Sequence, residues 1–269
     1  MPGARPDRLG SASRSECRMP TLVTIPFSHF CEKARWALDH ATVSFREEGH
    51  PPGLHRRAVR RVCGAAGSVP VLVLDDATTL DDSPLIVRWA DARAAEAHKL
   101  LPVQGQARDE ALALERHLDF DFAPHVRRLA YFHLLPDRAR SLALMRVGTP
   151  RIEHAIVRVA FPLLRRLMRR VMHIDEARAL KSRDKVRAVF DEMGRRLADG
   201  RAFLMGDHFG VADIAFAAFA APLLDPPEHP FRRPSPEVLP GLADEARALR
   251  ETPAGVFALR VYRDRRRLN

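Results

Sequence analysis

Ser28 and Cys31 form an S-x-x-C pattern at the point where a short apolar stretch gives way to a helical one. A thiol at such a position is a candidate nucleophile, and a hydroxyl there can donate to a thiolate, because the first N–H groups of a helix favour negative charge. Both residues also have purely structural interpretations. Ser28 is a good helix N-cap, and Cys31 is a small residue of a type that is commonly buried.

Two further short patterns lie downstream in the same half of the chain. Val69-Pro70 places a proline at the opening of an apolar strand. Asp82-Ser83-Pro84 is typical of a helix start, with Ser83 predicted as the N-cap and Pro84 as the first helical residue, where its missing N–H costs nothing.

The elements that position these patterns alternate between short apolar strands and amphipathic helices. In chain order we expect a strand at 21–25, a helix at 29–40, a strand at 42–47, a short helix at 53–63, two strands within 68–80 around an Asp75-Asp76 turn, and a helix from Ser83. The resulting order, β-α-β-α-β-β-α, is that of a small α/β domain of the thioredoxin type.

The rest of the chain reads as helical. The predicted organisation is a disordered tail at 1–19, a thioredoxin-like domain at 20–95, a linker at 96–107 and an all-helical domain at 108–269. Helices are predicted at 108–134, 137–147, 151–173, 177–199, 211–223 and 241–251. The proline-rich segment 225–241 is predicted to be a loop. For the basic, amphipathic segment 156–174, a bundle helix is favoured over a helix lying on a membrane surface.

Composition narrows the class of protein. The formal net charge is +10, but nearly all of the 44 basic residues are arginines spread along the chain, without a basic arm or interleaved aromatics. Charge of this kind bears on solubility and does not by itself indicate nucleic-acid binding. No uninterrupted apolar stretch reaches the roughly 20 residues of a membrane span. The histidines show no metal-ligand spacing, and no glycine-rich nucleotide motif occurs.

The three cysteines, Cys17, Cys31 and Cys63, do not make a disulfide framework, which favours a reducing compartment and hence the cytoplasm. The first nineteen residues lack the apolar core of a signal peptide. Met19 is a second candidate for the initiating residue.

Four segments, taken together, resemble the glutathione transferase superfamily. They are "PFSHFCEKARWAL" at 26–38, "SVPVL" at 68–72, "LDDSPLIVRW" at 80–89 and "FLMGDHFGVADIAFAAF" at 203–219, and they follow the family's order and spacing. The resemblance implies a thioredoxin-like N-terminal domain followed by a C-terminal helical bundle, a homodimer, and glutathione as co-substrate. One position departs from the pattern. Gly210 stands where the helix-capping box has Ser or Thr, although Asp213 can still reach back to the Gly210 N–H.

The resemblance also assigns roles to the candidate residues. Ser28 takes the catalytic position, where its hydroxyl would keep the glutathione sulfur as a thiolate that attacks a hydrophobic electrophile. Val69 precedes a proline, Pro70, that is cis in the family, which leaves the Val69 backbone to pair with the peptide. Asp82 and Ser83 would hold the γ-glutamyl end.

Other residues near these positions have open interpretations. His29 and Phe30 complete the predicted glutathione-binding set, and His29 either lines the acceptor pocket or faces solvent. In related proteins the first long helical region lines the electrophile pocket, but an aromatic stripe at helical spacing is more often core. The stripe consists of Phe120, Phe122, Tyr131, Phe132 and His133.

Two alternatives to conjugation stay open. In one, Cys31 acts as the nucleophile of a glutathione-dependent thiol transferase or reductase, which makes it the second candidate catalytic residue. Structural burial is the favoured interpretation of Cys31, because the second cysteine of such motifs is usually the less exposed. In the other, the protein is a non-catalytic glutathione-binding module, which its length, the departure at Gly210 and its basic surface allow.

Overall fold

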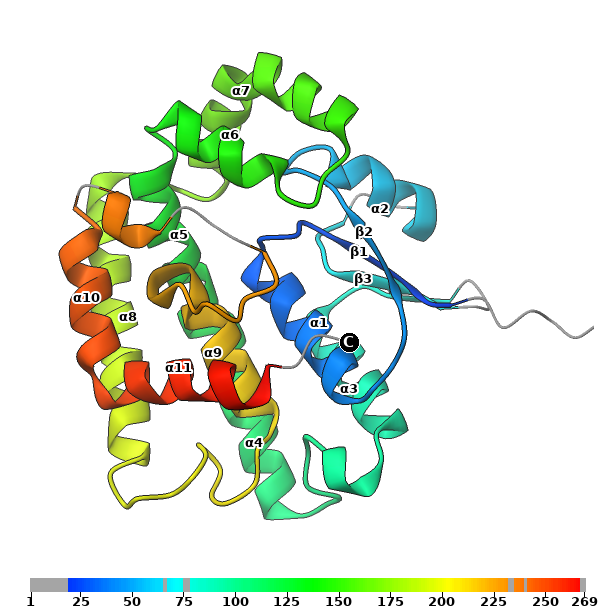
Figure 1. The fold of residues 1–269 in the computed structure, drawn as a ribbon, viewed down its shortest axis with the longest axis vertical. Coiled ribbons are helices and arrows are strands. Elements are labelled where there is room, and N and C mark those ends of the chain that lie inside the picture. The colour runs from blue at the N-terminus through cyan, green and yellow to red at the C-terminus, as the bar shows by residue number, and fades with distance from the viewer. Residues whose placement is uncertain (1–18, 65–66, 75–77, 232–234, 240, 267–269) are drawn as a thin grey trace, which may run out of the picture.

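The chain folds into a small sheet domain followed by a helical domain, as the computed structural model shows (Figure 1). It describes residues 19–64, 67–74, 78–231, 235–239 and 241–266. The first domain contains β1 (Thr21–Thr24), α1 (His29–His40), β2 (Arg46–Gly49), α2 (His55–Cys63), β3 (Val71–Val73), β4 (Thr79–Leu80) and α3 (Ser83–Arg93). This order confirms the predicted β-α-β-α-β-β-α unit. The predicted tail lies outside the described residues except for Met19.

The sheet has the strand order β2-β1-β3-β4. β1 pairs in parallel with β2 and antiparallel with β3, and β3 pairs antiparallel with β4. The turn predicted at Asp75-Asp76 lies outside the described residues. α1 packs against α3 and also against α9 of the helical domain. Because α1 is covered from both sides, most of its length is buried, charged residues included.

Two of the boundaries that differ from those predicted have a clear local cause. β2 begins at Arg46 and not at Thr42, because the chain between α1 and β2 is used to turn: the Val43 N–H donates to the Leu38 carbonyl at 3.0 Å. The N-cap of α3 is Asp82 and not Ser83. Asp82 has extended backbone angles and its carboxylate accepts the Ser83 N–H at 2.7 Å, which makes Ser83 the first helical residue.

The helical domain follows a connection that contains a short 3-10 turn, Glu96–His98. Its helices are α4 (Gln106–His117), α5 (Ala123–Leu134), α6 (Arg138–Arg146), α7 (Arg151–Val171), α8 (Glu176–Arg196), α9 (Val211–Leu224), α10 (Ala243–Glu251) and α11 (Pro253–Arg265). The described part of the predicted loop 225–241 forms no α-helix and contains one 3-10 turn, Pro236–Val238. Among the described residues, no helix combines the length and hydropathy needed to cross a membrane.

The segment predicted as one helix at 108–134 is interrupted by a π-helical turn, Leu118–Phe122, between α4 and α5. The cause lies one residue inside α5, where Pro124 has no N–H to donate to the carbonyl four residues earlier. At the far end of the domain, α11 is an additional helix that the periodicity does not predict. Thr252 caps it by accepting the Gly255 N–H at 3.0 Å, and Pro253 takes its first position.

α9 forms the centre of the helical domain and is buried on all sides (Figure 1). Its first turn carries the predicted capping box: Asp213 accepts the Gly210 N–H at 2.7 Å and also the Leu204 N–H at 2.8 Å. The structure gives a reason for glycine at position 210. A Cβ there would lie 2.9 Å from the Leu100 carbonyl oxygen, which accepts the Val211 N–H, so a serine or threonine would have to displace the backbone.

Candidate functional site

A cavity of about 500 Å³ lies between the two domains. The first domain contributes the loop between β1 and α1, the start of α2 and the segment before β3. The helical domain contributes α5, α7, the end of α9 and the 3-10 turn at 236–238. Four of the predicted site residues line it: Ser28, His29, Phe30 and Val69. The remaining walls are largely apolar and include Leu134, Leu144, Leu164, Met168 and Leu239.

Ser28 occupies the N-cap position of α1 with extended backbone angles, and its side chain makes no capping hydrogen bond. The helix start is held instead by the backbone, since the Glu32 N–H donates to the Ser28 carbonyl at 2.9 Å. The side chain of Ser28 lies near enough to Cys31 to lower the pKa of its thiol, and Ser28 also lines the cavity. A hydroxyl at this position can donate to a sulfur bound in the cavity.

Cys31 lies behind this position and has no exposed surface. Burial raises the pKa of its thiol to about 12, an effect that the nearby Arg35 charge offsets only in part. A thiol with this pKa carries almost no thiolate at neutral pH, and the thiolate is the nucleophilic form. The predicted burial of Cys31 is therefore confirmed, and the effect of that burial outweighs the neighbouring groups that would activate its thiol.

His29 and Phe30 form one aromatic wall of the cavity. The ring centroids of His29 and Phe30 are 4.7 Å apart, and His29 meets the edge of Phe219 of α9 at 5.4 Å. His29 is almost fully buried, so of its two predicted positions it takes the one in the pocket and not the one in solvent.

The Val69-Pro70 peptide bond is cis, as the resemblance implies. Val69 lines the cavity, whereas Pro70 is buried and directly precedes β3.

Asp82 and Ser83 lie outside the lining of the cavity. The Ser83 hydroxyl oxygen is buried and has no hydrogen-bond partner among the described residues. Asp82 lies close enough to Asp119 of the π-helical turn to influence it. Burial raises the pKa of Asp119 to about 6, and the ammonium of Lys33, 2.6 Å away, opposes that rise. Asp82 and Ser83 are thus next to a buried charged cluster, and their predicted contact with a peptide ligand stays a prediction.

Arg127 and Tyr131 of α5 also line the cavity; the sequence pattern did not single out Arg127, and Tyr131 belongs to the aromatic stripe whose interpretation was open between pocket and core. They lie one turn apart on the face of α5 that also carries Ala130 and Leu134, and all four line the cavity. Burial raises the pKa of Tyr131 to about 12, so its phenol stays protonated and can donate a hydrogen bond. The sequence does contain a signal for Arg127. It is an arginine on an otherwise largely apolar helix face, which is defined by the spacing i, i+3, i+4 and i+7.

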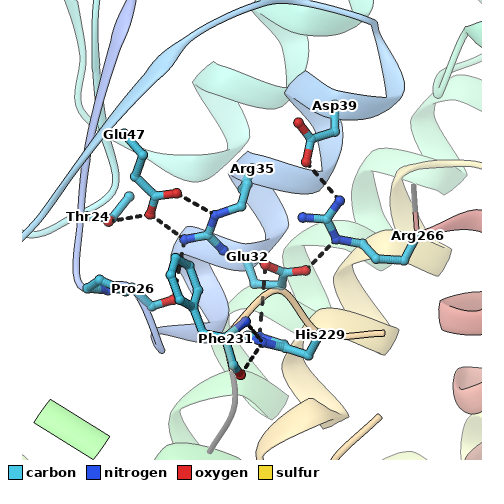
Figure 2. Close-up of polar contacts among 9 residues, drawn as sticks. All are labelled: Thr24, Pro26, Glu32, Arg35, Asp39, Glu47, His229, Phe231 and Arg266. Atoms are coloured by element: carbon cyan, nitrogen blue, oxygen red, sulfur yellow. Dashed lines mark hydrogen bonds and ion pairs between the residues drawn. The ribbon is translucent and has the colours of Figure 1, made fainter. Parts of the chain in front are cut away.

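The loop that carries Ser28 is held in place by a buried ion network, which Figure 2 shows. Arg35 of α1 donates from Nε to Glu47 of β2 at 2.8 Å, pairs with Glu32 one turn earlier, and donates to the Pro26 carbonyl at 3.3 Å. Because Pro26 lies two residues before Ser28, this last contact ties the loop to the side of its own helix.

The C-terminal segment completes the network. Arg266, which directly follows α11, donates to Glu32 at 2.7 Å and to Asp39 at 2.8 Å, so it spans two turns of α1 (Figure 2). Burial alone would raise the pKa of Glu32, but the opposing charges of Arg266, His229 and Arg35 lower it to about 2. The network therefore keeps its carboxylate ionised and fastens the end of the chain to the helix that begins at Ser28.

No group of three or more His, Cys, Asp or Glu side chains in the described part of the chain is arranged to hold a metal ion.

Comparisons with known proteins agree with the family resemblance in the sequence. A model of the glutathione S-transferase N-terminal domain matches residues 22–98, and a model of the glutathione S-transferase C-terminal domain matches residues 159–244. A search of the curated proteins found no match.

Solved structures with the same fold include a glutathione S-transferase from Xanthobacter autotrophicus Py2, which is 20% identical with a TM-score of 0.59 over 90% of this chain and 91% of that one. A theta class glutathione S-transferase from Xanthomonas axonopodis pv. citri, solved with glutathione bound, is 23% identical with a TM-score of 0.55 over 89% and 96% of the two chains. A β-etherase from Sphingobium sp. strain SYK-6 is 16% identical with a TM-score of 0.59 over 90% and 99%.

Proposed function

The chain belongs to the glutathione S-transferase superfamily, and from that premise we propose that it conjugates the thiolate of glutathione to an electrophile bound in the cavity between its two domains. The observation that carries the proposal is the position of Ser28. Its side chain does not cap α1, yet it lies at the first turn of that helix and at the wall of the cavity.

The energy available at Ser28 matches what thiol activation requires. A thiol with a pKa of about 8.5 is only a few per cent ionised at neutral pH, and lowering that pKa by two units requires about 2.7 kcal/mol. A hydrogen bond to a charged group contributes about 1.5–3 kcal/mol, and a helix N-terminus adds about 0.3–1 kcal/mol. The Ser28 hydroxyl and the start of α1 together supply this amount.

Glutathione has two carboxylates and one ammonium at neutral pH, and the cavity offers groups of both signs. Arg56 from the start of α2 lines the cavity, and Asp225 is the one carboxylate among its described lining residues, whereas burial lowers the pKa of His55 to about 4 and leaves its imidazole neutral. In the proposal, Ser28 faces the sulfur, Val69 pairs with the peptide backbone, and Asp82 and Ser83 hold the γ-glutamyl end.

The reaction needs no group beyond these residues and the two substrates. The glutathione sulfur attacks the electrophilic carbon, a C–S bond forms, and the bond to the leaving group breaks, with the leaving group carrying away the electron pair. The apolar wall of the cavity binds the electrophile and excludes water from the thiolate.

A homodimeric state and a cytoplasmic location, as in the family resemblance, belong to the same proposal. Cys31 and Cys63 are free thiols, which is the state expected in a reducing compartment.

Steady-state conjugation of glutathione to a chlorodinitrobenzene, combined with retention on immobilised glutathione, tests the proposal. We expect Ser28→Ala to lower kcat/KM about ten- to a hundredfold, because it removes one hydrogen bond to a charged group, while retention on the glutathione resin persists. A Ser68→Ala variant serves as the matched control, since Ser68 is an exposed serine at the rim of the same cavity. Retention without turnover on a broad panel of electrophiles would favour the non-catalytic binding module instead, and an unchanged rate in Ser28→Ala would remove Ser28 from the mechanism.

A further inference from the structure

Arg127 is partly buried and, among the described residues, no ion pair or hydrogen bond joins it to a carboxylate, in contrast to the fully buried Arg35 and Arg266. Arg35 pairs with Glu32 and Glu47, and Arg266 pairs with Glu32 and Asp39. Around Arg127, the described residues provide an aromatic ring, a phenol and the like charge of Arg128. The guanidinium carbon of Arg127 lies 5.8 Å from the centroid of the Phe30 ring, and Tyr131 is its other close electrostatic neighbour on the cavity side.

The surroundings of Arg127 make this lack of a partner significant. Burial lowers the pKa of its guanidinium, which shows that its charge is partly withdrawn from water, yet an arginine stays protonated in a protein. A charge taken out of water is costly unless it is paired. An anion bound in the cavity can reach this guanidinium, since Arg127 lines it.

Tyr131 adds a second donor beside the first. It lies one helical turn after Arg127 and also lines the cavity, and its phenol remains protonated at all physiological pH values because burial raises its pKa to about 12. A guanidinium and a phenolic hydroxyl side by side, with Leu164 and Met168 of α7 among the apolar walls, match a ligand that is apolar over most of its surface and carries one acidic group.

We propose that Arg127 is the residue that determines electrophile specificity, and that it selects electrophiles bearing a carboxylate, which it binds bidentately while the apolar wall holds the rest of the molecule. This inference rests on the proposed function, because it concerns the second substrate of the same cavity. The inference also makes the proposed function more specific, because a cavity with apolar walls alone would favour the neutral electrophile.

A pair of electrophiles that differ in one charge tests the inference. The probes are a chlorodinitrobenzoate, which carries a carboxylate on the ring, and its methyl ester. In both, glutathione sulfur forms a bond to the ring carbon that bears chlorine, and chloride leaves with the bonding electron pair. kcat and KM for each electrophile, and KM for glutathione, are measured for the wild type, Arg127→Met and Arg127→Lys.

We expect Arg127→Met to lower kcat/KM about ten- to a hundredfold for the benzoate, mainly through KM, because a hydrogen-bonded charge pair is lost. The methyl ester is expected to be conjugated at nearly the wild-type rate or faster. Arg127→Lys should restore part of the preference for the acid, because it restores the charge without the bidentate geometry. Arg169→Met, which removes an exposed arginine from the outer side of α7, is the control for net charge and should leave both substrates unaffected.

The inference is overturned if the wild type prefers the ester and Arg127→Met changes both substrates equally. It is also overturned if Arg127→Met raises KM for glutathione alone, because Arg127 would then bind the peptide. Calorimetric titration with the pre-formed benzoate and ester conjugates separates this inference from the proposed function. A preference for the acidic conjugate that Arg127→Met abolishes supports the inference even if no turnover occurs, a result that would count only against the proposed reaction. Equal affinity for the two conjugates overturns it.

Discussion

The charged groups along the flank of α1 and those at the cavity beside its first turn differ in how they are paired. Along its flank, Glu32 and Arg35 belong to a network in which every guanidinium meets a carboxylate, with Arg266 joining from the end of the chain. At its first turn, Ser28 opens onto a cavity where the nearest basic group of α5, Arg127, has no carboxylate partner among the described residues. The matched charges fasten two domains together, whereas the unmatched charge is available to a ligand. Pairing therefore distinguishes the part of the molecule that holds the fold from the part that is open to chemistry.

The largest expected effect comes from removing one member of the buried ion network along the flank of α1. Arg266→Met leaves Glu32 and Asp39 buried without their main partner, and removing one member of a buried ion pair typically costs about 3–5 kcal/mol. We expect a loss of this order in the free energy of unfolding, measured by urea denaturation. Arg263→Met, three residues earlier on the exposed side of α11, is the control and should behave like the wild type, because its ion pair with Asp264 is on the surface. Equal stability of the two variants would mean that the network does not fasten the domains.

Low pH also removes an ion pair from the network, because it protonates Glu32. The pKa of Glu32 is about 2 in the folded protein against an ordinary value of 4.5. Because the folded value is depressed, the stabilisation is fully present above pH 4.5 and is lost as the pH falls through about 2. Urea midpoints measured at a series of pH values should fall across this range in the wild type and should fall less in Glu32→Gln. Parallel pH profiles for the two proteins would contradict the assignment of the depressed pKa to Glu32.

The smallest expected effect concerns Cys31, which lies near Ser28 but is fully buried and does not line the cavity. Cys31→Ala should leave the conjugation rate unchanged and reduce stability by about 1 kcal/mol, because one buried sulfur is removed. In the wild type, a thiol-specific alkylating reagent should modify the partly exposed Cys63 well before Cys31. Rapid alkylation of Cys31, together with loss of all activity in Cys31→Ala, would favour thiol transfer over conjugation.

The fold was largely predictable because its signals are local. Apolar runs and amphipathic periods gave the order of strands and helices in the first domain, and the "GVAD" segment gave the capping box of α9 with its glycine. The differences lie at boundaries that depend on backbone hydrogen bonds. β2 starts late because Val43 is bonded back to α1, and α4 and α5 are separate because Pro124 interrupts the helical ladder.

The candidate site was predictable only where it rests on short motifs. Ser28 and Val69 were found because each lies at a recognisable junction, and both line the cavity. Arg127 was not found, because its significance depends on which face of α5 turns toward α1. The pairing of Glu32 with Arg266 joins positions 234 residues apart, and no local pattern encodes it.

The role of Ser28 is tested most directly by the pKa of the glutathione thiol when bound to this protein, measured from the ultraviolet absorbance of the thiolate as the pH is varied. We expect bound glutathione to ionise about one to two pH units below the free tripeptide, because Ser28 donates to the sulfur at the start of α1. We expect Ser28→Ala to bind glutathione still but to return the thiol pKa toward its free value. A bound thiol with the same pKa in the wild type and in Ser28→Ala would contradict the central claim.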